Sequence, residues 1–469
     1  MRPDKLVTQI KPAGRLERLK RMAGLDHRQS ASHPPDVTSR PGPASRTNRP
    51  AVGAQRRERP ARSWRSPERI HALLIDCLAG RALAADRELS TLGLWDRAAC
   101  AACEARVGGA LDEALARQRV SPPPSAKRIL DGYRASVAAR NAYQITRMRP
   151  VFRELGAAGV ECLLLKGAAL NLTLYAAPGV RDMSDIDLLI RPGDLEAADG
   201  ALRAAGCRRG AEPVRADFFP RFYYEREYLT GDQPSVRIDL HVRPFRPLWY
   251  AATVPDHALW DGSVCVDFGG ASLRVPGPAD TFLHLCVHAA CHGCTQLRWM
   301  WDIVLFMDRY RDAADWDAWV RRADDWGVRY AVYRTLRSLR RSFGDTVRLS
   351  ARGPGVTAPE DRLQNVTPDD PCEGVLDLAA IAERFRCHPT PGEWWAITQA
   401  PRDADHPTAH VLTNLLSLSG WRNRLSYLAA VALPDRSHMA HWYPRRHRGW
   451  LAVAHLARLM RMRGPQVDG

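Results

Sequence analysis

The stretch LLLKGAALNLTLYAAPGVRDMSDIDLLI, residues 163–190, decides the fold of this chain. It begins with a short apolar run typical of a buried strand, ends that run at Lys166 and Gly167, and continues through a segment of helical length. A second apolar run then opens with two acids, Asp185 and Asp187. Side chains two positions apart in a strand point to the same face, so both carboxylates project together from the sheet. Such a pair repels itself, and a divalent cation is the obvious partner.

The segment SVRIDLHVR, residues 235–243, adds a third acid. Its residues alternate strictly, so that Asp239 and His241 lie on the face opposite to the apolar side chains. The run FYYEREYLT, residues 222–230, precedes it across the turn residues GDQP, and the two runs predict a β-hairpin. If this strand lies beside the strand that carries the first two acids, Asp239 completes a set of three carboxylates. That is the ligand set needed to hold two Mg²⁺ ions on a nucleoside triphosphate.

The pattern LKGAAL…LY…PGVRDMSDIDLLI…VRIDLHVR resembles a group of uncharacterised bacterial nucleotidyltransferase family proteins within the DNA polymerase beta-like nucleotidyltransferase superfamily. The resemblance is dense over residues 151–243 and looser from about residue 66 to the C-terminus. It implies that the three acids bind the metal ions and that Lys166 and Gly167 lie at the triphosphate. Most of the superfamily has Gly-Ser where this chain has Lys166 and Gly167, so a hydroxyl contact to the triphosphate is missing here.

The candidate site residues are expected to divide the work. Asp185 and Asp187 are expected to bind both Mg²⁺ ions, whereas Asp239 binds the catalytic ion and helps to deprotonate the acceptor hydroxyl. Lys166 is the last of only five lysines in the chain, and an ammonium next to a glycine at a strand end suits a phosphate group. A chance lysine at a strand end is the alternative. The further candidates for nucleotide contact are Gly167, Arg181, Ser184 and His241.

Three of the supporting residues have two interpretations each. Arg181 precedes the acidic pair on a Pro-Gly loop and is either free to reach phosphate or paired with a neighbouring aspartate. His241 shares a strand face with Asp239, which suits it to support the metal ligands. His288 lies between His284 and His292 on one helix face. In the resembled family such a helix packs beside the metal site, so His288 either serves the triphosphate or acceptor, or is a hydrogen-bonded core residue.

The predicted fold is α+β, with a small mixed nucleotidyltransferase-type sheet, flanking helices, and N- and C-terminal helical regions. The predicted segments are a disordered basic tail at 1–65, a helical region at 66–150, a nucleotidyltransferase core at 151–250, a hairpin with helices at 251–343, a linker at 344–371 and a C-terminal helical region at 372–469.

Most of the net charge of +16 lies in the tail, where residues 1–65 carry 16 Lys or Arg and five acids. This tail has almost no large apolar side chains, so it cannot bury enough surface to order itself. It is interpreted as an upstream start-codon error, a solvated cationic arm, or an arm that docks an anionic polymer. Nucleic-acid binding is therefore expected only weakly, through the tail.

The remaining composition indicates a soluble cytoplasmic protein. The chain has neither a secretory signal nor an apolar run long enough to span a membrane. Its 11 scattered cysteines are typical of reduced thiols. Two pairs with CxxC spacing, Cys100 with Cys103 and Cys291 with Cys294, either form a zinc site or are small buried residues of helices.

The sequence thus predicts Mg²⁺-dependent transfer of a nucleoside monophosphate from a nucleoside triphosphate to an unidentified acceptor, with release of pyrophosphate. The alternative is a non-catalytic module on the same fold that binds a nucleotide or a partner protein. A cluster of unused carboxylates would repel itself, which favours the enzyme. An enzyme directed at nucleic acid would need a basic, aromatic-lined groove in the folded part of the chain.

Overall fold

The computed structural model describes residues 67–175, 177–210, 218–349, 374–399, 407–418 and 420–433. The chain divides into two units, residues 1–61 and 62–469, and all described residues belong to the second unit. The basic tail expected at 1–65 lies outside the described residues.

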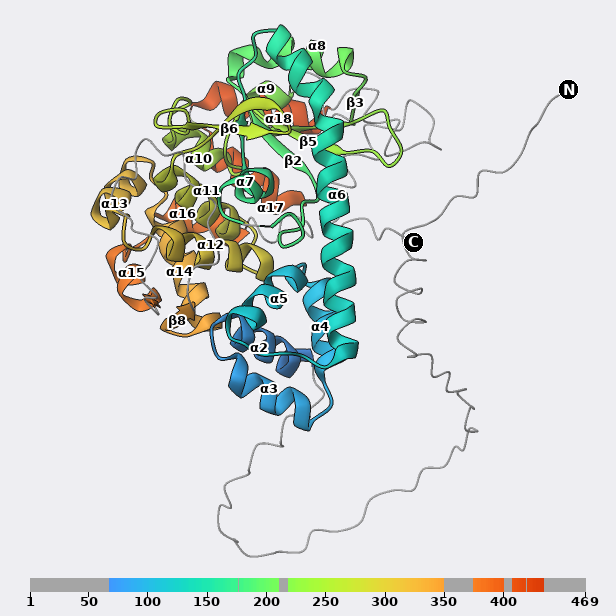
Figure 1. The fold of residues 1–469 in the computed structure, drawn as a ribbon. Coiled ribbons are helices and arrows are strands. Elements are labelled where there is room, and N and C mark those ends of the chain that lie inside the picture. Colours follow the sequence, from blue (N-terminus) through green and yellow to red (C-terminus); the bar gives the residue numbers. More distant parts are fainter. Residues whose placement is uncertain are drawn as a thin grey trace, which may run out of the picture. The chain divides into compact units, whose positions relative to one another are not determined.

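The second unit contains a seven-stranded mixed sheet with the strand order β3-β4-β5-β2-β1-β7-β6 (Figure 1). β2 runs parallel to β5 and β1 runs parallel to β7, whereas the other neighbours are antiparallel. The sheet is larger than the small one predicted, because the β6–β7 hairpin, which was assigned to a separate region, pairs with β1. The strands are β1 (Leu163–Leu164), β2 (Ile186–Leu189), β3 (Arg208–Arg209), β4 (Glu225–Leu229), β5 (Arg237–His241), β6 (Val264–Phe268) and β7 (Ala271–Val275).

The alternation of apolar and acidic residues fixes how β2 and β5 sit in the sheet. Ile186 and Leu188 of β2 and Ile238 and Leu240 of β5 are buried in one apolar core. Burying side chains of this size stabilises the fold by about 1.5–3 kcal/mol each. A slip of one residue would exchange these side chains for the acids, so the register is strongly specified. The acids therefore face the opposite side of the sheet.

Helices cover both faces of this sheet. They are α2 (Pro67–Leu78), α3 (Ala82–Thr91), α4 (Trp95–Glu104), α5 (Gly108–Arg117), α6 (Pro124–Ala157), α7 (Lys166–Thr173), the 3-10 helix η1 (Pro192–Asp194), α8 (Leu195–Ala204), α9 (Phe218–Phe222), α10 (Leu248–Thr253), α11 (Pro278–Cys291), α12 (Leu297–Tyr310), α13 (Trp316–Asp325), α14 (Arg329–Phe343), α15 (Leu378–Arg384), α16 (Pro391–Gln399), α17 (Pro407–Ser417) and α18 (Trp421–Ala432).

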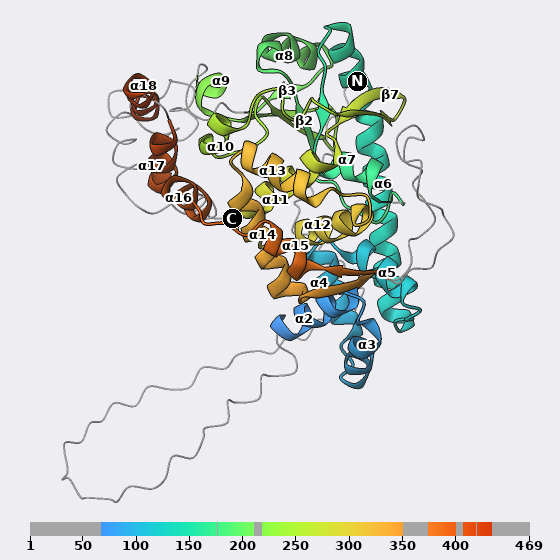
Figure 2. The same cartoon turned by 90° about the vertical axis from the view of Figure 1, so that its left-hand side faces the viewer.

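The 34-residue helix α6 links the N-terminal helices to the sheet (Figure 1). It begins at Pro124, where a proline is tolerated because the first amide of a helix has no partner inside the helix. It contacts α4 and α5, and also α8 and β7. With α8 it covers the apolar face of β2 and β5. Figure 2 shows α8 on the other side of the sheet from α11 and α12, which pack on the face of the acids.

The predicted linker at 344–371 begins with a strand instead. β8 (Thr346–Leu349) pairs antiparallel with β9 (Gly374–Asp377) and buries Val347 against the helices. This part of the prediction is wrong, because the alternation of Val347 and Leu349 was read as polar linker sequence. Residues 350–373 lie outside the described part of the chain.

No helix among the described residues is long and apolar enough to cross a membrane. The cytoplasmic location stays a prediction. The cysteines that the structure describes are free thiols, among them both CxxC pairs.

The fold predicts opposite effects for two glycine-to-alanine substitutions. A Cβ atom on Gly109 in α5 would lie 2.5 Å from the carbonyl oxygen of Val180, so Gly109→Ala should destabilise the protein by about 1–3 kcal/mol. Gly132 in α6 has nothing within 4 Å of that position, and Gly132→Ala should stabilise the protein by about 0.5–1 kcal/mol through helix propensity. Urea unfolding of both variants measures the difference, and equal effects would contradict the close contact.

Candidate active site

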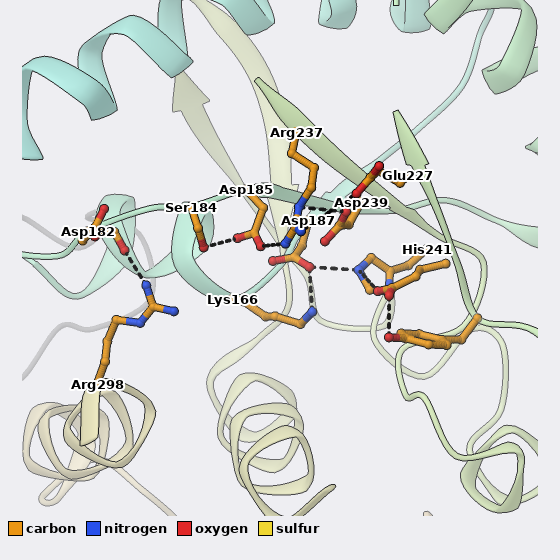
Figure 3. Close-up of polar contacts among 12 residues, drawn as sticks. Lys166, Asp182, Ser184, Asp185, Asp187, Glu227, Arg237, Asp239, His241 and Arg298 are labelled. Atoms are coloured by element: carbon orange, nitrogen blue, oxygen red, sulfur yellow. Dashed lines mark hydrogen bonds and ion pairs between the residues drawn. The ribbon is translucent and has the colours of Figure 1, made fainter. Parts of the chain in front are cut away.

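Three carboxylates lie together at one point of the sheet. Asp187 and Asp239 are direct partners in the register of the parallel strands β2 and β5. Asp185 precedes β2 by one residue. Figure 3 shows the three side chains directed toward one another, with Lys166 on one side of the group and Arg237 on the other. The sequence-based expectation that the 235–243 strand lies beside β2 is confirmed by this pairing.

Asp187 is buried and held by two cationic or hydrogen-bonding partners. The ammonium of Lys166 donates to its Oδ1 atom at 2.6 Å, and Nε2 of His241 lies 2.9 Å from the same oxygen. Burial opposes ionisation, but Lys166 and His241 outweigh it and hold the pKa of Asp187 well below its usual range. Burial likewise disfavours the charged Lys166, yet Asp187 and Glu225 raise the pKa of this lysine above its ordinary value. Both groups are therefore charged at neutral pH.

Arg237 of β5 connects the other two aspartates. Its Nη2 atom donates to Oδ2 of Asp185 at 2.5 Å, and its Nε atom lies 3.5 Å from Oδ1 of Asp239. The hydroxyl of Ser184 donates to the second oxygen of Asp185 at 2.9 Å. Ser184 and His241, both candidates for nucleotide contact, thus contact carboxylates of the site in this structure.

The neighbouring strand β4 brings two further acids, which the sequence analysis missed. Glu227 lies opposite Asp239 and Glu225 lies opposite His241 in the antiparallel register. The Oε2 atom of Glu225 is 3.6 Å from Nε2 of His241, and Tyr224 donates its hydroxyl to Oε1 of Glu225 at 2.5 Å. The alternation of the two glutamates in FYYEREYLT, combined with the predicted hairpin, was the signal that could have found them.

Negative charge is in excess around Asp239. Burial, together with the charges of Asp187 and Glu225, raises the pKa of Asp239 to about 7. The single nearby guanidinium, of Arg237, does not offset these effects. A further cation placed among these carboxylates would therefore be bound favourably.

Lys166 begins α7 in a backbone conformation that non-glycine residues rarely adopt. Its φ angle is +47°, in the left-handed region, which costs roughly 1–2 kcal/mol. Strain of this kind is found at functional sites where the surrounding structure enforces it. The turn directs the lysine side chain to Asp187 and places the first amides of α7 beside the site. Unpaired amides at a helix N-terminus favour bound anions.

Arg181 is not free to reach phosphate, and this prediction is corrected. The side chain is buried, and it donates from Nη2 and Nε to the two carboxylate oxygens of Asp302 at 2.7 and 3.2 Å. Its Nη1 atom donates to the carbonyl of Asp182 at 2.6 Å. Gly167 leaves room for this guanidinium, because a Cβ atom there would lie 2.8 Å from Nη1. Arg181 is therefore part of the support of the site.

The loop before Asp185 is held from several directions. Asn141 of α6 donates to the carbonyls of Pro178 and Arg181, at 2.8 and 2.9 Å. The buried carboxylate of Asp182 accepts from Arg106 at 2.8 Å and also pairs with Arg140. These partners lie 37 to 76 positions from the residues that they hold, so local patterns in the sequence could not reveal them.

The three histidines of α11 and its C-terminal end are buried or partly buried beside Lys166. Burial and the charge of Lys166 lower the pKa of His284 to about 3, and lower the pKa of His288 well below its ordinary value. The pKa of His292 is lowered to about 4. His288 and His292 stack on each other and on Trp299, with ring centroids 4.6–5.0 Å apart. A cavity of about 20 Å³, lined by Lys166, His288 and His292 among others, has room for roughly one water molecule.

The donor set of the site suits magnesium in its chemistry. Carboxylate oxygens are the ligands that Mg²⁺ prefers, and Asp185, Asp187 and Asp239 project from one face of the sheet. As positioned here, with Lys166 and Arg237 between the acids, the described residues include no group of three or more His, Cys, Asp or Glu side chains that could hold a metal ion. The same statement covers the described cysteines of the two CxxC pairs, so the zinc interpretation gains no support.

Residues 93–344, which contain every site residue named above, match the model of the family described as "Uncharacterised nucleotidyltransferase", and the chain belongs to this family. No curated protein matches the chain.

Two solved structures are similar to parts of the chain. The first is the solution structure of the antibiotic-resistance factor ANT(2'')-Ia, with 15% identity, 42% of this chain and 95% of that chain covered, and a TM-score of 0.28. The second is the crystal structure of an antigenic nucleotidyltransferase-like protein from Paracoccidioides brasiliensis, with 13% identity, coverage of 43% and 92%, and a TM-score of 0.24. Likenesses with scores this low carry no argument about the present chain.

The raised pKa of Asp239 predicts how stability depends on pH. Folded Asp239 keeps its proton up to a pH of about 7, whereas the unfolded chain releases it near the ordinary value of 3.8. Between these values the folded state binds more protons, so the contribution of Asp239 to the free energy of unfolding falls as pH rises. The difference in that free energy between the wild type and Asp239→Asn should therefore fall from pH 4 to about pH 7. Urea unfolding in EDTA at several pH values measures it; a constant or rising difference would contradict the electrostatics described here.

The corrected role of Arg181 predicts a loss of stability on substitution. Arg181→Met leaves the carboxylate of Asp302 buried without its cation, which should lower the free energy of unfolding by about 3–5 kcal/mol. Arg384→Met, which breaks an exposed pair with Asp317, is the matched control and should cost about 1 kcal/mol or less. If both variants unfold alike and only Arg181→Met loses nucleotide binding, the original phosphate-binding role is restored.

Proposed function

We propose that the chain transfers a nucleoside monophosphate from a nucleoside triphosphate to an acceptor hydroxyl and releases pyrophosphate. The acceptor oxygen would form a bond to the α-phosphorus, and the bond from that phosphorus to the β-phosphate oxygen would break. The observation that supports this proposal most is the pairing of Asp187 with Asp239 in adjacent parallel strands, with Asp185 beside them. Membership of the nucleotidyltransferase family supports nucleotidyl transfer in general.

Asp185, Asp187 and Asp239 are the residues that would hold two Mg²⁺ ions. Bound there, the ions would neutralise phosphate charge and make the acceptor hydroxyl easier to deprotonate. The carboxylate of Asp239 is assigned to the acceptor side of the reaction, where it would receive the hydroxyl proton. Its place in β5, next to Asp187 and open toward Arg237, supports this assignment.

Lys166 and the backbone of Gly167 are assigned to the triphosphate. In this structure the lysine neutralises Asp187, so it would exchange a carboxylate oxygen for a phosphate oxygen when the substrate binds. The N-terminus of α7, which Lys166 and Gly167 form, favours negative charge at the same point. His241 and Ser184 would orient Asp187 and Asp185, respectively, as they do here.

One observation favours a non-catalytic module as the second candidate function. Lys166 and Arg237 already neutralise much of the carboxylate charge, so the cluster does not have to bind a metal ion to persist. The argument that an unused cluster would repel itself is therefore weaker than the sequence suggested. Calorimetric titration with ATP and Mg²⁺, followed by measurement of pyrophosphate, separates the two functions, because a module binds without releasing pyrophosphate.

The proposal predicts that Asp187→Asn reduces nucleoside monophosphate transfer by at least about a hundredfold, or about 2.7 kcal/mol in the activation free energy. Asparagine keeps the size of the side chain and can still accept hydrogen bonds from Lys166 and His241, so the fold should persist. Transfer of label from α-³²P-labelled triphosphates to products in a cell lysate is the measurement, with near-UV circular dichroism as the test of folding.

Glu196→Gln is the matched control, because it removes an exposed carboxylate of α8 and should leave the transfer unchanged. Full transfer by the Asp187→Asn variant would refute the assignment of the site.

A further inference from the structure

A second pocket opens away from the carboxylates, at the opposite end of β1. It has a volume of about 540 Å³, within the range of small-molecule sites. Its walls come from α6, from the segment that enters β1, and from the β6–β7 hairpin. Cys162 lines it just before β1, whereas Lys166 of the active site follows the same strand. The two sites are therefore distinct.

The floor of this pocket is apolar and firmly packed. Phe152, Leu155 and Leu273 line it, and all three are buried side chains of the core between the sheet and α6. The ring of Phe152 meets that of Phe268 edge-on, with the ring centroids 5.4 Å apart. A ligand seated here would contact a surface that is already fixed by the core.

The rim of the pocket is cationic. Arg149, Arg153 and Arg274 contribute three guanidinium groups, against the single acid Glu161 among the lining residues. Arg274 is held in place, since it donates to the hydroxyl of Ser263 at 2.8 Å. Within the ranges that the structure describes, no carboxylate pairs with Arg149. An anion at the rim would therefore meet a guanidinium that has no competing carboxylate.

The glycine turn of the hairpin sets the width of the pocket. Gly269 and Gly270 have φ angles of +63° and +91°, which favour glycine. A Cβ atom on Gly269 would lie 2.6 Å from Cγ2 of Ile145, so only glycine lets the turn approach α6 this closely. The apolar floor and the cationic rim are thus held next to each other.

We propose that this pocket binds a small organic anion that combines an apolar ring or chain with one phosphate, carboxylate or sulfonate group. The apolar part covers Phe152 and Leu273, and the charged group contacts Arg149 and Arg274. Either part alone lacks half of the complementary surface, so both are required. This ligand is separate from the triphosphate that is assigned to Lys166.

The test uses 1-naphthyl phosphate as the probe, titrated into the full chain by calorimetry, with inorganic phosphate and 1-naphthol as the two half-ligands. The probe should bind saturably at one site and at least about tenfold more tightly than either half-ligand. Arg149→Glu should weaken binding about tenfold or more, because it reverses a charge at the rim. Arg321→Ala, an exposed arginine of α13, should leave binding unchanged.

Two further variants keep the result decisive. Gly156 lines the pocket, and a Cβ atom on it would have nothing within 4 Å, so Gly156→Leu should obstruct the pocket without a clash and weaken binding. Lys166→Met alters the active site alone and should leave the probe bound. The proposal is overturned if Arg149→Glu and Gly156→Leu bind the probe as the wild type does, if Lys166→Met abolishes binding, or if 1-naphthol binds as tightly as its phosphate.

Discussion

The parallel pairing of β2 with β5 is the constraint on which the site depends. It places Asp187 and Asp239 side by side in a half-buried position, where two carboxylates are unstable without compensating charge. Apolar residues on the opposite face hold the register, so the strands cannot slip to separate the acids. Lys166 and Arg237 supply the compensation in this structure. The carboxylates, their cations and the core beneath them therefore form one interdependent unit.

The chain spends much of its charged sequence on supporting this unit. Arg181 and Asp302 form a buried pair behind Gly167, and Asp182 is held by two arginines from the N-terminal helices. Buried ion pairs of this kind contribute more to a unique geometry than to stability, since desolvation offsets their attraction. The helices of residues 67–157 thus act on the site through the loop that precedes β2, which is why the family match includes part of them.

Alternation along single strands allowed much of the site to be predicted from the sequence. It predicted the shared face of Asp185 and Asp187, the hairpin that leads to Asp239, and the pairing of that strand with β2. It could not predict that Arg181 turns inward, because its partner Asp302 lies 121 positions away. Nor did it assign the β6–β7 hairpin to the main sheet, since the pairing with β1 rests on a single register contact between distant segments. Glu225 and Glu227 were missed although their alternation was visible.

The central claim is that the three aspartates together bind the metal ions of a nucleotidyl transfer reaction. The most direct measurement is anomalous X-ray scattering from crystals that contain Mn²⁺ and a non-hydrolysable nucleoside triphosphate analogue. The account predicts manganese peaks within coordination distance of Asp185, Asp187 and Asp239, with phosphate oxygens bound by Lys166. Peaks elsewhere in the chain, or triphosphate bound with the three carboxylates still paired to Lys166 and Arg237, would contradict it.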